Sequence, residues 1–306
     1  SQGILYKPQN FDSSKLYPLI FNYYEKYSHR LYQLQFPALT QSNVNIPWFG
    51  SRGYLVFLAD VYYGDGSKTG ITSGRYALNA VESAAAVLCK RSYIDSNRLA
   101  IQGHSFGGLE TNYIFTHSNK FAAAAEGAGF TDVMSSYLTL TGKGMGSVDI
   151  DAVQEHKERD HELYGATPWE KPELYLDNSP VWSAHNATAP LLMFHNKKDE
   201  QVQWRQGVEM YMALRRLGKP CWMLQYDNSG HILLDRKDAL DYTIRLTQFF
   251  DHYLKHQPAP RWMTEGIPAK FKQIEDRYEL DPKGCCWKNC KECNKPQSLA
   301  EASVVH

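Results

Sequence analysis

The sequence predicts one large α/β domain in which helices cover both faces of a mainly parallel sheet. Short apolar runs typical of buried strands alternate along the chain with stretches of helical periodicity, and no repeat of fixed period interrupts them. With 306 residues, of which 43% are hydrophobic, the chain can bury a large core. Right-handed helical crossovers between parallel strands are the arrangement that this alternation favours.

The first half of the chain supplies four predicted strands and two helices. The strands are expected at 16–24, 53–61, 98–102 and 121–128. Apolar residues at 77, 81, 84, 85 and 88 are spaced as on one face of a helix. A sharp turn follows the third strand, and 108–117 contains no helix breaker, so it is expected to be the second helix.

The second half begins with a polar, proline-interrupted stretch, 131–182, which we expect to be an excursion over the sheet. Regular structure is then expected as strand, helix, strand and helix at 190–194, 204–217, 221–226 and 237–255. Pro258 and Pro260 end the last helix. We therefore expect one α/β domain followed by an irregular, loosely attached C-terminal extension.

Charge and hydropathy exclude several partners. Lys plus Arg and Asp plus Glu each total 33, so no net field draws the chain to nucleic acid or to an anionic membrane surface. No run of about 18 apolar residues predicts a membrane span. The amino terminus has no basic and apolar targeting pattern, which leaves the compartment open.

The six cysteines fall into two groups. Cys89 and Cys221 are isolated in apolar surroundings and are expected to fill the core. A cluster in the extension, Cys285, Cys286, Cys290 and Cys293, has spacing that suits a disulfide or metal site. The vicinal pair is awkward for tetrahedral zinc and no histidine stands in a ligand pattern, so no metal is predicted. The alternative to a disulfide or metal cluster is an irregular, mobile tail.

The sharp turn at 103–108, Gly-His-Ser-Phe-Gly-Gly, is typical of a nucleophile elbow. Gly103 and Gly107 flank Ser105 by two residues, where a Cβ would crowd a turn that holds the hydroxyl forward. A glycine turn with an idle serine is the alternative, because this short motif also arises by chance.

An acid and a histidine follow later strands, which favours the nucleophile. Asp199 lies just beyond the strand ending at 194, and His231 just beyond the strand ending near 226. The order Ser105, Asp199, His231 is that of the α/β-hydrolase fold. Glu200 and Asp227 remain alternatives for the acid, since an aspartate in a loop is often only a turn residue.

These residues predict acyl transfer without a cofactor. His231 would take the proton of Ser105 while Asp199 fixes the imidazole tautomer. The backbone N–H of Phe106 is the expected first oxyanion donor. No glycine-rich oxyanion loop follows the first strand; Tyr24 stands there, and its phenol is either the second donor or a packing residue.

Blocks along the chain resemble the catalytic domain of S9 serine peptidases, the prolyl oligopeptidase and dipeptidyl peptidase IV group. Besides the elbow, they are YKP at 6–8, YLDNSP at 175–180, ALRRLGKP at 213–220, FFDHYL at 249–254 and WMTEGIP at 262–268. The resemblance spans about 5–269, which implies a catalytic domain over 1–269 and an irregular C-terminal extension over 270–306. It is strongest to Bacteroidetes-type bacterial members. It implies an α/β-hydrolase fold, peptide substrates and a periplasmic or secreted location, and it allows a homodimer.

The same resemblance implies that Ser105, Asp199 and His231 form the triad and that Tyr24 is the oxyanion tyrosine. It further implies that Gln201 and Val202 border the substrate and that Tyr164 lines a proline-sized pocket.

Two features depart from the family pattern. Glu25, Lys26 and Tyr27 replace the usual Gly-Gly-Pro, so the loop beside the oxyanion hole is expected to sit differently. The β-propeller that precedes this domain in the family is not in the sequence and is expected in the full-length protein. A carboxylesterase with the same triad, or an inactive interaction domain with a closed hole, are the alternatives to a peptidase.

Overall fold

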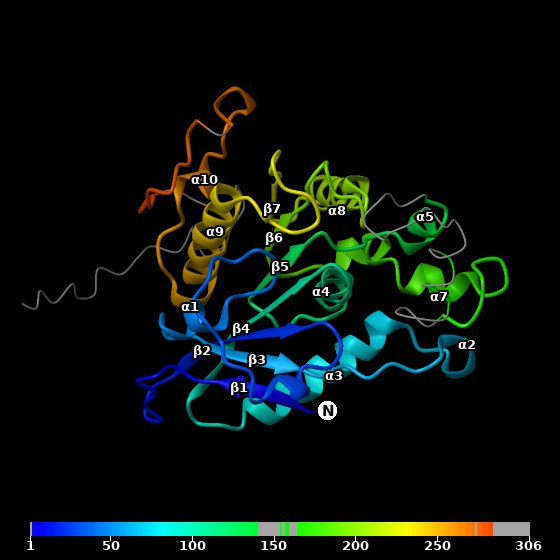
Figure 1. Cartoon of the computed structure of the whole chain (residues 1–306), viewed down its shortest axis with the longest axis horizontal. Helices are drawn as coiled ribbons and strands as arrows, with labels where there is room; N and C mark the ends of the chain where they lie inside the picture. Colours follow the sequence, from blue (N-terminus) through cyan, green and yellow to red (C-terminus); the bar gives the residue numbers. More distant parts are fainter. Residues whose placement is uncertain (1, 140–153, 155–156, 159–163, 273, 284–306) are drawn as a thin grey trace, which may run out of the picture. The chain divides into compact units, whose positions relative to one another are not determined.

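A seven-stranded sheet with the order β1-β3-β2-β4-β5-β6-β7 organises the computed structural model (Figure 1). The structure describes residues 2–139, 154, 157–158, 164–272 and 274–283. The strands are β1 (Gly3–Tyr6), β2 (Tyr17–Tyr23), β3 (Leu55–Ala59), β4 (Ile94–His104), β5 (Ala123–Gly127), β6 (Leu191–Phe194) and β7 (Cys221–Leu224). β1 is antiparallel to β3, and all other neighbours are parallel. The predicted fold class is confirmed.

Helices cover the sheet because alternate side chains of each strand point to opposite faces. Leu19 and Phe21 of β2 belong to the larger core cluster, which also contains Ala77 of α3. On the other face, Phe194 of β6 packs against Tyr242 of α9 with ring centroids 4.7 Å apart. The helices are α1 (Ile46–Gly50), α2 (Gly66–Thr69), α3 (Ser73–Leu88), α4 (Phe106–His117), α5 (Val133–Tyr137), α7 (Pro172–Asp177), α8 (Trp204–Arg216) and α9 (Arg236–Lys255), with 3₁₀ turns η1 (Ser28–Arg30) and η4 (Pro180–Asn186).

The structure adds one strand that the sequence pattern does not predict and lengthens another. β1 has only four residues, of which Ile4 alone is buried, so it gives no continuous apolar run. β4 begins at Ile94 rather than at 98. The sequence pattern misses this start because a polar, partly exposed stretch, 95–98, separates the buried Ile94 from the buried second half. The described part of the 131–182 excursion contains α5, α7 and the start of η4.

The chain divides into two compact units, Ser1–His256 and Gln257–His306. In the second unit the described residues form α10 (Arg261–Thr264), the 3₁₀ turn η5 (Ala269–Phe271) and a β-bridge between Pro260 and Leu280. The predicted domain boundary at 269 stays a prediction. Cys89 and Cys221 are free thiols. The cysteine cluster at 285–293 lies outside the described residues.

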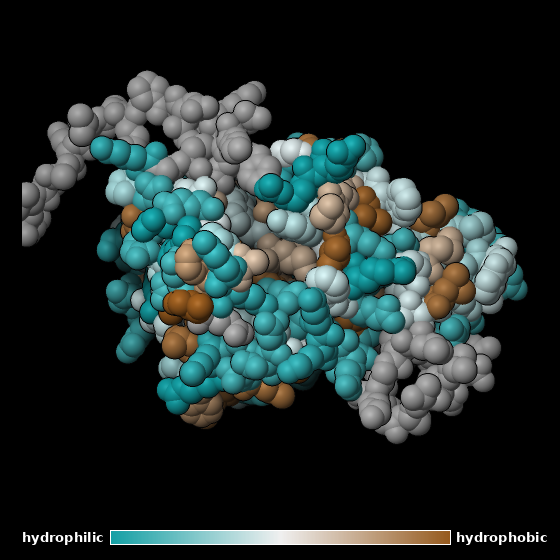
Figure 2. Space-filling view, turned by 90° about the horizontal axis from the view of Figure 1, so that it is seen from above, coloured by the Kyte–Doolittle hydropathy of each residue, from teal (hydrophilic) through white to brown (hydrophobic). Residues whose placement is uncertain are grey.

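The surface is mixed in character. On the face shown in Figure 2, hydrophobic residues form separate patches among hydrophilic ones. None of the described helices is both long enough and apolar enough to cross a bilayer.

Candidate active site

Ser105 occupies a strained turn between β4 and α4. Its φ of 60° and ψ of −120° are rarely adopted by a residue with a Cβ. Backbone hydrogen bonds hold this conformation: the Ser105 N–H donates to Gly127 O at 2.7 Å, and Ser105 O accepts from the Gly108 N–H at 2.9 Å. The turn therefore has the backbone that a nucleophile elbow requires.

The glycines around Ser105 are required by close packing. A Cβ on Gly107 would lie 2.6 Å from the carbonyl oxygen of Tyr23, the last residue of β2. A Cβ on Gly103 would collide with the carbonyl group of Gly107 itself. Both positions therefore need glycine for α4 to start directly after the turn that ends β4, as the motif predicts.

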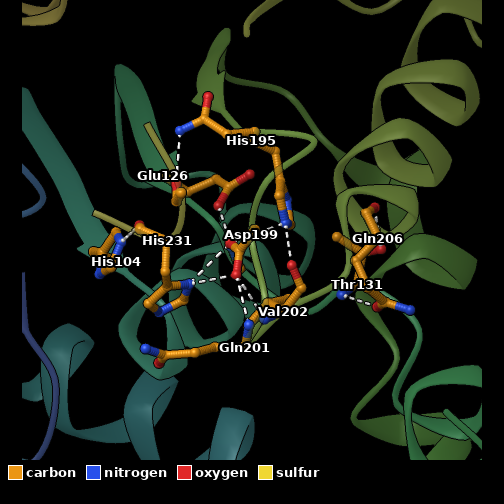
Figure 3. A network of polar contacts seen from close by, with 12 residues as sticks. His104, Glu126, Thr131, His195, Asp199, Gln201, Val202, Gln206 and His231 are labelled. Atoms are coloured by element: carbon orange, nitrogen blue, oxygen red, sulfur yellow. Dashed lines mark hydrogen bonds and ion pairs between the residues drawn. The ribbon is translucent and has the colours of Figure 1, made fainter. Parts of the chain in front are cut away.

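Asp199 and His231 form a hydrogen-bonded pair beyond the carboxyl ends of β6 and β7 (Figure 3). His231 Nδ1 lies 2.9 Å from Asp199 Oδ2 and 3.0 Å from Oδ1. The N–H groups of Gln201 and Val202 each donate to Oδ1 at 2.9 Å. Asp227, the alternative acid, accepts a hydrogen bond from the side chain of Gln225 instead.

The environment of Asp199 favours its ionised form. Burial alone would raise the pKa of this carboxyl, but the hydrogen bond and charge of His231, together with His195 and the Val202 N–H, hold the pKa below its usual value. An ionised Asp199 accepts the Nδ1 proton of His231 and leaves Nε2 as the basic nitrogen.

His104 ties the His231 loop to the elbow. Its Nε2–H donates to the backbone oxygen of His231 at 2.8 Å, and the two imidazole rings lie 4.7 Å apart. Burial, with a smaller contribution from His231, lowers the pKa of His104 to about 3. Because His104 directly precedes Ser105, this bond brings the loop after β7 to the turn that carries the predicted nucleophile.

His195 is a second imidazole beside the acid. It is fully buried, its Nε2–H donates to Val202 O at 2.9 Å, and Nε2 lies 3.5 Å from Asp199 Oδ2. Burial lowers the pKa of His195 despite the neighbouring carboxylate. Gly207 of α8 leaves room for this ring, since a Cβ there would lie 2.7 Å from His195 Nδ1.

Buried neutral histidines predict a loss of stability in acid. The native state keeps His104 unprotonated down to pH about 3, whereas the unfolded chain binds that proton near the ordinary pKa of 6.5. The unfolded state therefore binds more protons between these values, and the free energy of unfolding should fall by about 1.4 kcal/mol per pH unit on acidification through this window. Urea midpoints at pH 7, 5.5 and 4.5 test this, and His104→Asn should show a shallower fall than the wild type. An unchanged slope in the variant would contradict the assignment.

Tyr24 directly follows β2, and the side chain of Ser105 lies close enough to its hydroxyl to favour the phenolate slightly. Its ring packs edge-to-face on Phe106 with centroids 5.9 Å apart. Burial raises the pKa of Tyr24, so the phenol stays neutral and can donate a hydrogen bond. Phe106 is the first residue of α4, and the N–H groups of a helix's first turn point out of its N-terminus. The two predicted oxyanion donors are therefore both neighbours of Ser105.

The loop that replaces the family's Gly-Gly-Pro is fastened to the end of β3. Asp60 Oδ1 accepts from the N–H groups of Tyr27 at 2.6 Å and of Ser28 at 2.8 Å. The Val61 N–H donates to Glu25 O at 2.7 Å. These bonds give the substituted loop a defined backbone beside Tyr24.

The predicted substrate residues occupy different environments. Tyr164 is fully buried, packs against the tilted ring of Tyr175 with centroids 4.4 Å apart and hydrogen-bonds with Asn178. Val202 is buried, whereas the side chain of Gln201 is exposed next to the acid. Roles for these three in substrate binding stay predictions. The aromatic cluster around Phe106 also has partly buried members that can present surface to a ligand: Tyr24, Tyr63, Phe130 and Met134.

Within the described part of the chain, no three His, Cys, Asp or Glu side chains converge as they would around a metal ion.

Residues 40–257 match the model of the prolyl oligopeptidase family, Peptidase S9. The chain belongs to this family. The S9 resemblance of the sequence is thereby confirmed. Among prolyl oligopeptidase-family relatives, the uncharacterized peptidase YuxL of Bacillus subtilis is 24% identical over 265 residues, which are 82% of this chain and 37% of that protein. Dipeptidyl-peptidase 5 of Porphyromonas endodontalis is 27% identical over 269 residues, with 82% and 35% covered.

Solved structures of the family share the fold. A puromycin-hydrolyzing peptidase of Mycobacterium tuberculosis aligns with a TM-score of 0.64 and 20% identity over 82% of this chain and 37% of that one. The chain thus spans little more than a third of the length of the relatives that it matches. Within this chain, Ser105, Asp199 and His231 all follow the carboxyl ends of strands.

Proposed function

We propose that this domain is a serine peptidase that hydrolyses peptide bonds of oligopeptides through an acyl-enzyme on Ser105. The observation that carries the proposal is the Asp199–His231 pair, which a hydrogen bond from His104 ties to the strained Ser105 turn, with the phenol of Tyr24 near the Ser105 side chain. The names of two similar proteins support peptides as substrates: dipeptidyl-peptidase 5, and an acylaminoacyl peptidase whose solved structure aligns with a TM-score of 0.62 and 22% identity over 83% of this chain.

The geometry supports a two-step mechanism. His231 Nδ1 is engaged by Asp199, so Nε2 takes the proton of Ser105 as Oγ attacks the carbonyl carbon. The phenol of Tyr24 and the N–H of Phe106 stabilise the oxyanion, and His231 then protonates the leaving amine. Water repeats the sequence on the acyl-enzyme, with His231 again as base, and restores Ser105.

The proposal also covers which residues select the substrate. We assign Tyr164, Gln201 and Val202 to the surroundings of the residue before the cleaved bond. A homodimer, a β-propeller elsewhere in the full-length protein and a periplasmic or secreted location stay predictions.

The test is turnover of dipeptide and tripeptide anilides that carry proline or alanine before the bond, beside an ester of the same acyl group. We expect anilide turnover that prefers proline and disappears in Ser105→Ala. Turnover of the ester without the anilides would mean that the domain is an esterase and not a peptidase. A wild type that neither turns over nor reacts with a fluorophosphonate would indicate an inactive interaction domain.

A further inference from the structure

The hydroxyl of Tyr63 lies between the backbone of Tyr24 and a buried acid. Tyr63 Oη is 2.6 Å from the carbonyl oxygen of Tyr24 and in short hydrogen-bond contact with Glu110 Oε1. Glu110 belongs to α4, four residues after Phe106, and is fully buried. Neither Tyr63 nor Glu110 takes part in the mechanism above.

Counting protons at Tyr63 indicates the form of Glu110. A phenol has one hydrogen to donate, and the Tyr24 carbonyl can only accept. If Glu110 were ionised, it too could only accept. An ionised Glu110 would have to share the single phenol proton with Tyr24 O, whereas a protonated Glu110 that donates to Tyr63 Oη, while Tyr63 donates to Tyr24 O, gives each contact its own proton.

The surroundings of Glu110 favour the protonated acid. Burial raises its pKa well above the usual value, the Glu25 carboxylate acts in the same direction, and the Tyr63 bond opposes them. Its second oxygen, Oε2, has no hydrogen-bond partner among the described residues, and no ion pair within them reaches Glu110. The ionisable groups that act on or are acted on by Glu110 from β2 and its following loop are Tyr23, Tyr24, Glu25 and Tyr27, and from the loop after β3 Tyr63.

Aromatic packing makes the chain from Glu110 to Tyr24 compact. The ring of Tyr63 lies edge-to-face on Phe106 at 5.5 Å, and Tyr24 packs on the same ring at 5.9 Å. Tyr24 follows the last residue of β2, where the sheet's ladder of hydrogen bonds ends. The bond from Tyr63 to the Tyr24 carbonyl therefore holds the backbone just where the strand no longer does.

We propose that Glu110, as the neutral acid, and Tyr63 form a positioning pair that fixes the backbone of Tyr24 and so aims its phenol at the oxyanion. The inference rests on the proposed function, because it assigns the pair to the oxyanion donor of that reaction. A donor that is held in place before the reaction stabilises the transition state more than one that must reorganise.

A double-mutant cycle tests the route through Tyr24. Tyr24→Phe should lower kcat by about 10²- to 10³-fold, the usual effect of losing one oxyanion donor. Tyr63→Phe should lower kcat by about tenfold with KM within about twofold, the scale of one hydrogen bond. Combined, they should cost no more than Tyr24→Phe alone, since Tyr63 acts through a phenol that is already gone. Tyr62→Phe is the matched control, because this neighbouring tyrosine is exposed and bonds only weakly with Asp60, at 3.3 Å. Losses that multiply in the double variant would overturn the proposal.

Glu110→Gln tests the protonated acid. The amide N–H can replace the acid proton as donor to Tyr63, so kcat near neutral pH should match the wild type. Glu110→Leu, which cannot donate, should resemble Tyr63→Phe. If Glu110→Gln lowers kcat near neutral pH as much as Glu110→Leu does, the neutral acid is ruled out.

Infrared spectra give a readout that needs no turnover. The carbonyl band of a protonated carboxylic acid should be present at neutral pH and diminish in Glu110→Gln. Glu126, a second buried acid whose pKa burial raises to about 8, provides the reference, since Glu126→Gln should remove a different component of this band. A missing Glu110 component would refute the positioning pair even if the wild type were inactive. If the wild type is active and the kcat losses of Tyr24→Phe and Tyr63→Phe multiply in the double variant, the positioning pair is refuted while the proposed peptidase activity stands.

Discussion

Ser105→Ala is expected to reduce turnover of a peptide anilide by about 10⁶-fold while the protein remains folded. The hydroxyl is the group that bonds to the substrate, so its removal leaves only binding and the oxyanion donors. Alanine keeps the Cβ at the φ of 60°, and the bonds that hold the turn come from the Ser105 backbone, so we expect a melting temperature close to that of the wild type. The measurement is kcat with the best anilide of the panel, beside thermal unfolding.

His231→Ala should cost about as much as Ser105→Ala, and the double variant no more than either, because the two groups act as one unit. A fluorophosphonate should label the wild type, fail to label Ser105→Ala and label His231→Ala slowly. Ser14→Ala, at an exposed serine, should behave as the wild type. Labelling that persists in Ser105→Ala would place the nucleophile elsewhere.

The triad candidates were predictable because each lies directly after a strand with a clear apolar signal. Parallel strands bring their carboxyl ends to one edge, so Ser105, Asp199 and His231 could be assigned to the same region without any knowledge of distances. The sequence already favoured Asp199 and left Asp227 as an alternative because both follow strands; in the folded loop it is the Asp199 carboxylate that meets the His231 ring.

Supporting residues were not predictable in the same way. Tyr63 and Glu110 are 47 positions apart, and neither lies in a motif that indicates the other. Glu110 sits on α4, a helix buried on all sides from 106 to 116, so no polar face of the helix distinguished it. A glutamate in such a segment is nevertheless a signal, because an acid without a cation is rarely buried unless it is protonated or bonded.

The fold followed from the apolar runs for a similar reason. Four strands, β2, β3, β5 and β6, are buried along their whole length. Each therefore appears in the sequence as a run of mainly apolar or small residues without polar alternation. β1 is short, lies at the edge and is half exposed, so its position depends on pairing with β3 rather than on its own composition.

Asp199→Asn is expected to lower kcat by about 10⁴-fold with little change in KM. The surrounding donors determine how the amide must lie. Oδ1 of Asp199 accepts from two backbone N–H groups, those of Gln201 and Val202, so the asparagine oxygen has to take that place. Its NH₂ group then occupies the position of Oδ2, 2.9 Å from His231 Nδ1.

An NH₂ group facing Nδ1 turns that nitrogen into an acceptor, which moves the imidazole proton to Nε2, the nitrogen that must take the proton of Ser105. The variant therefore keeps the shape of the site and loses the base, so both anilide turnover and fluorophosphonate labelling should slow while substrate still binds. Asp227→Asn is the matched control, an aspartate that also follows a strand and should retain wild-type kcat. A larger loss in Asp227→Asn than in Asp199→Asn would mean that the catalytic acid is Asp227 and that the Asp199–His231 pair is only structural.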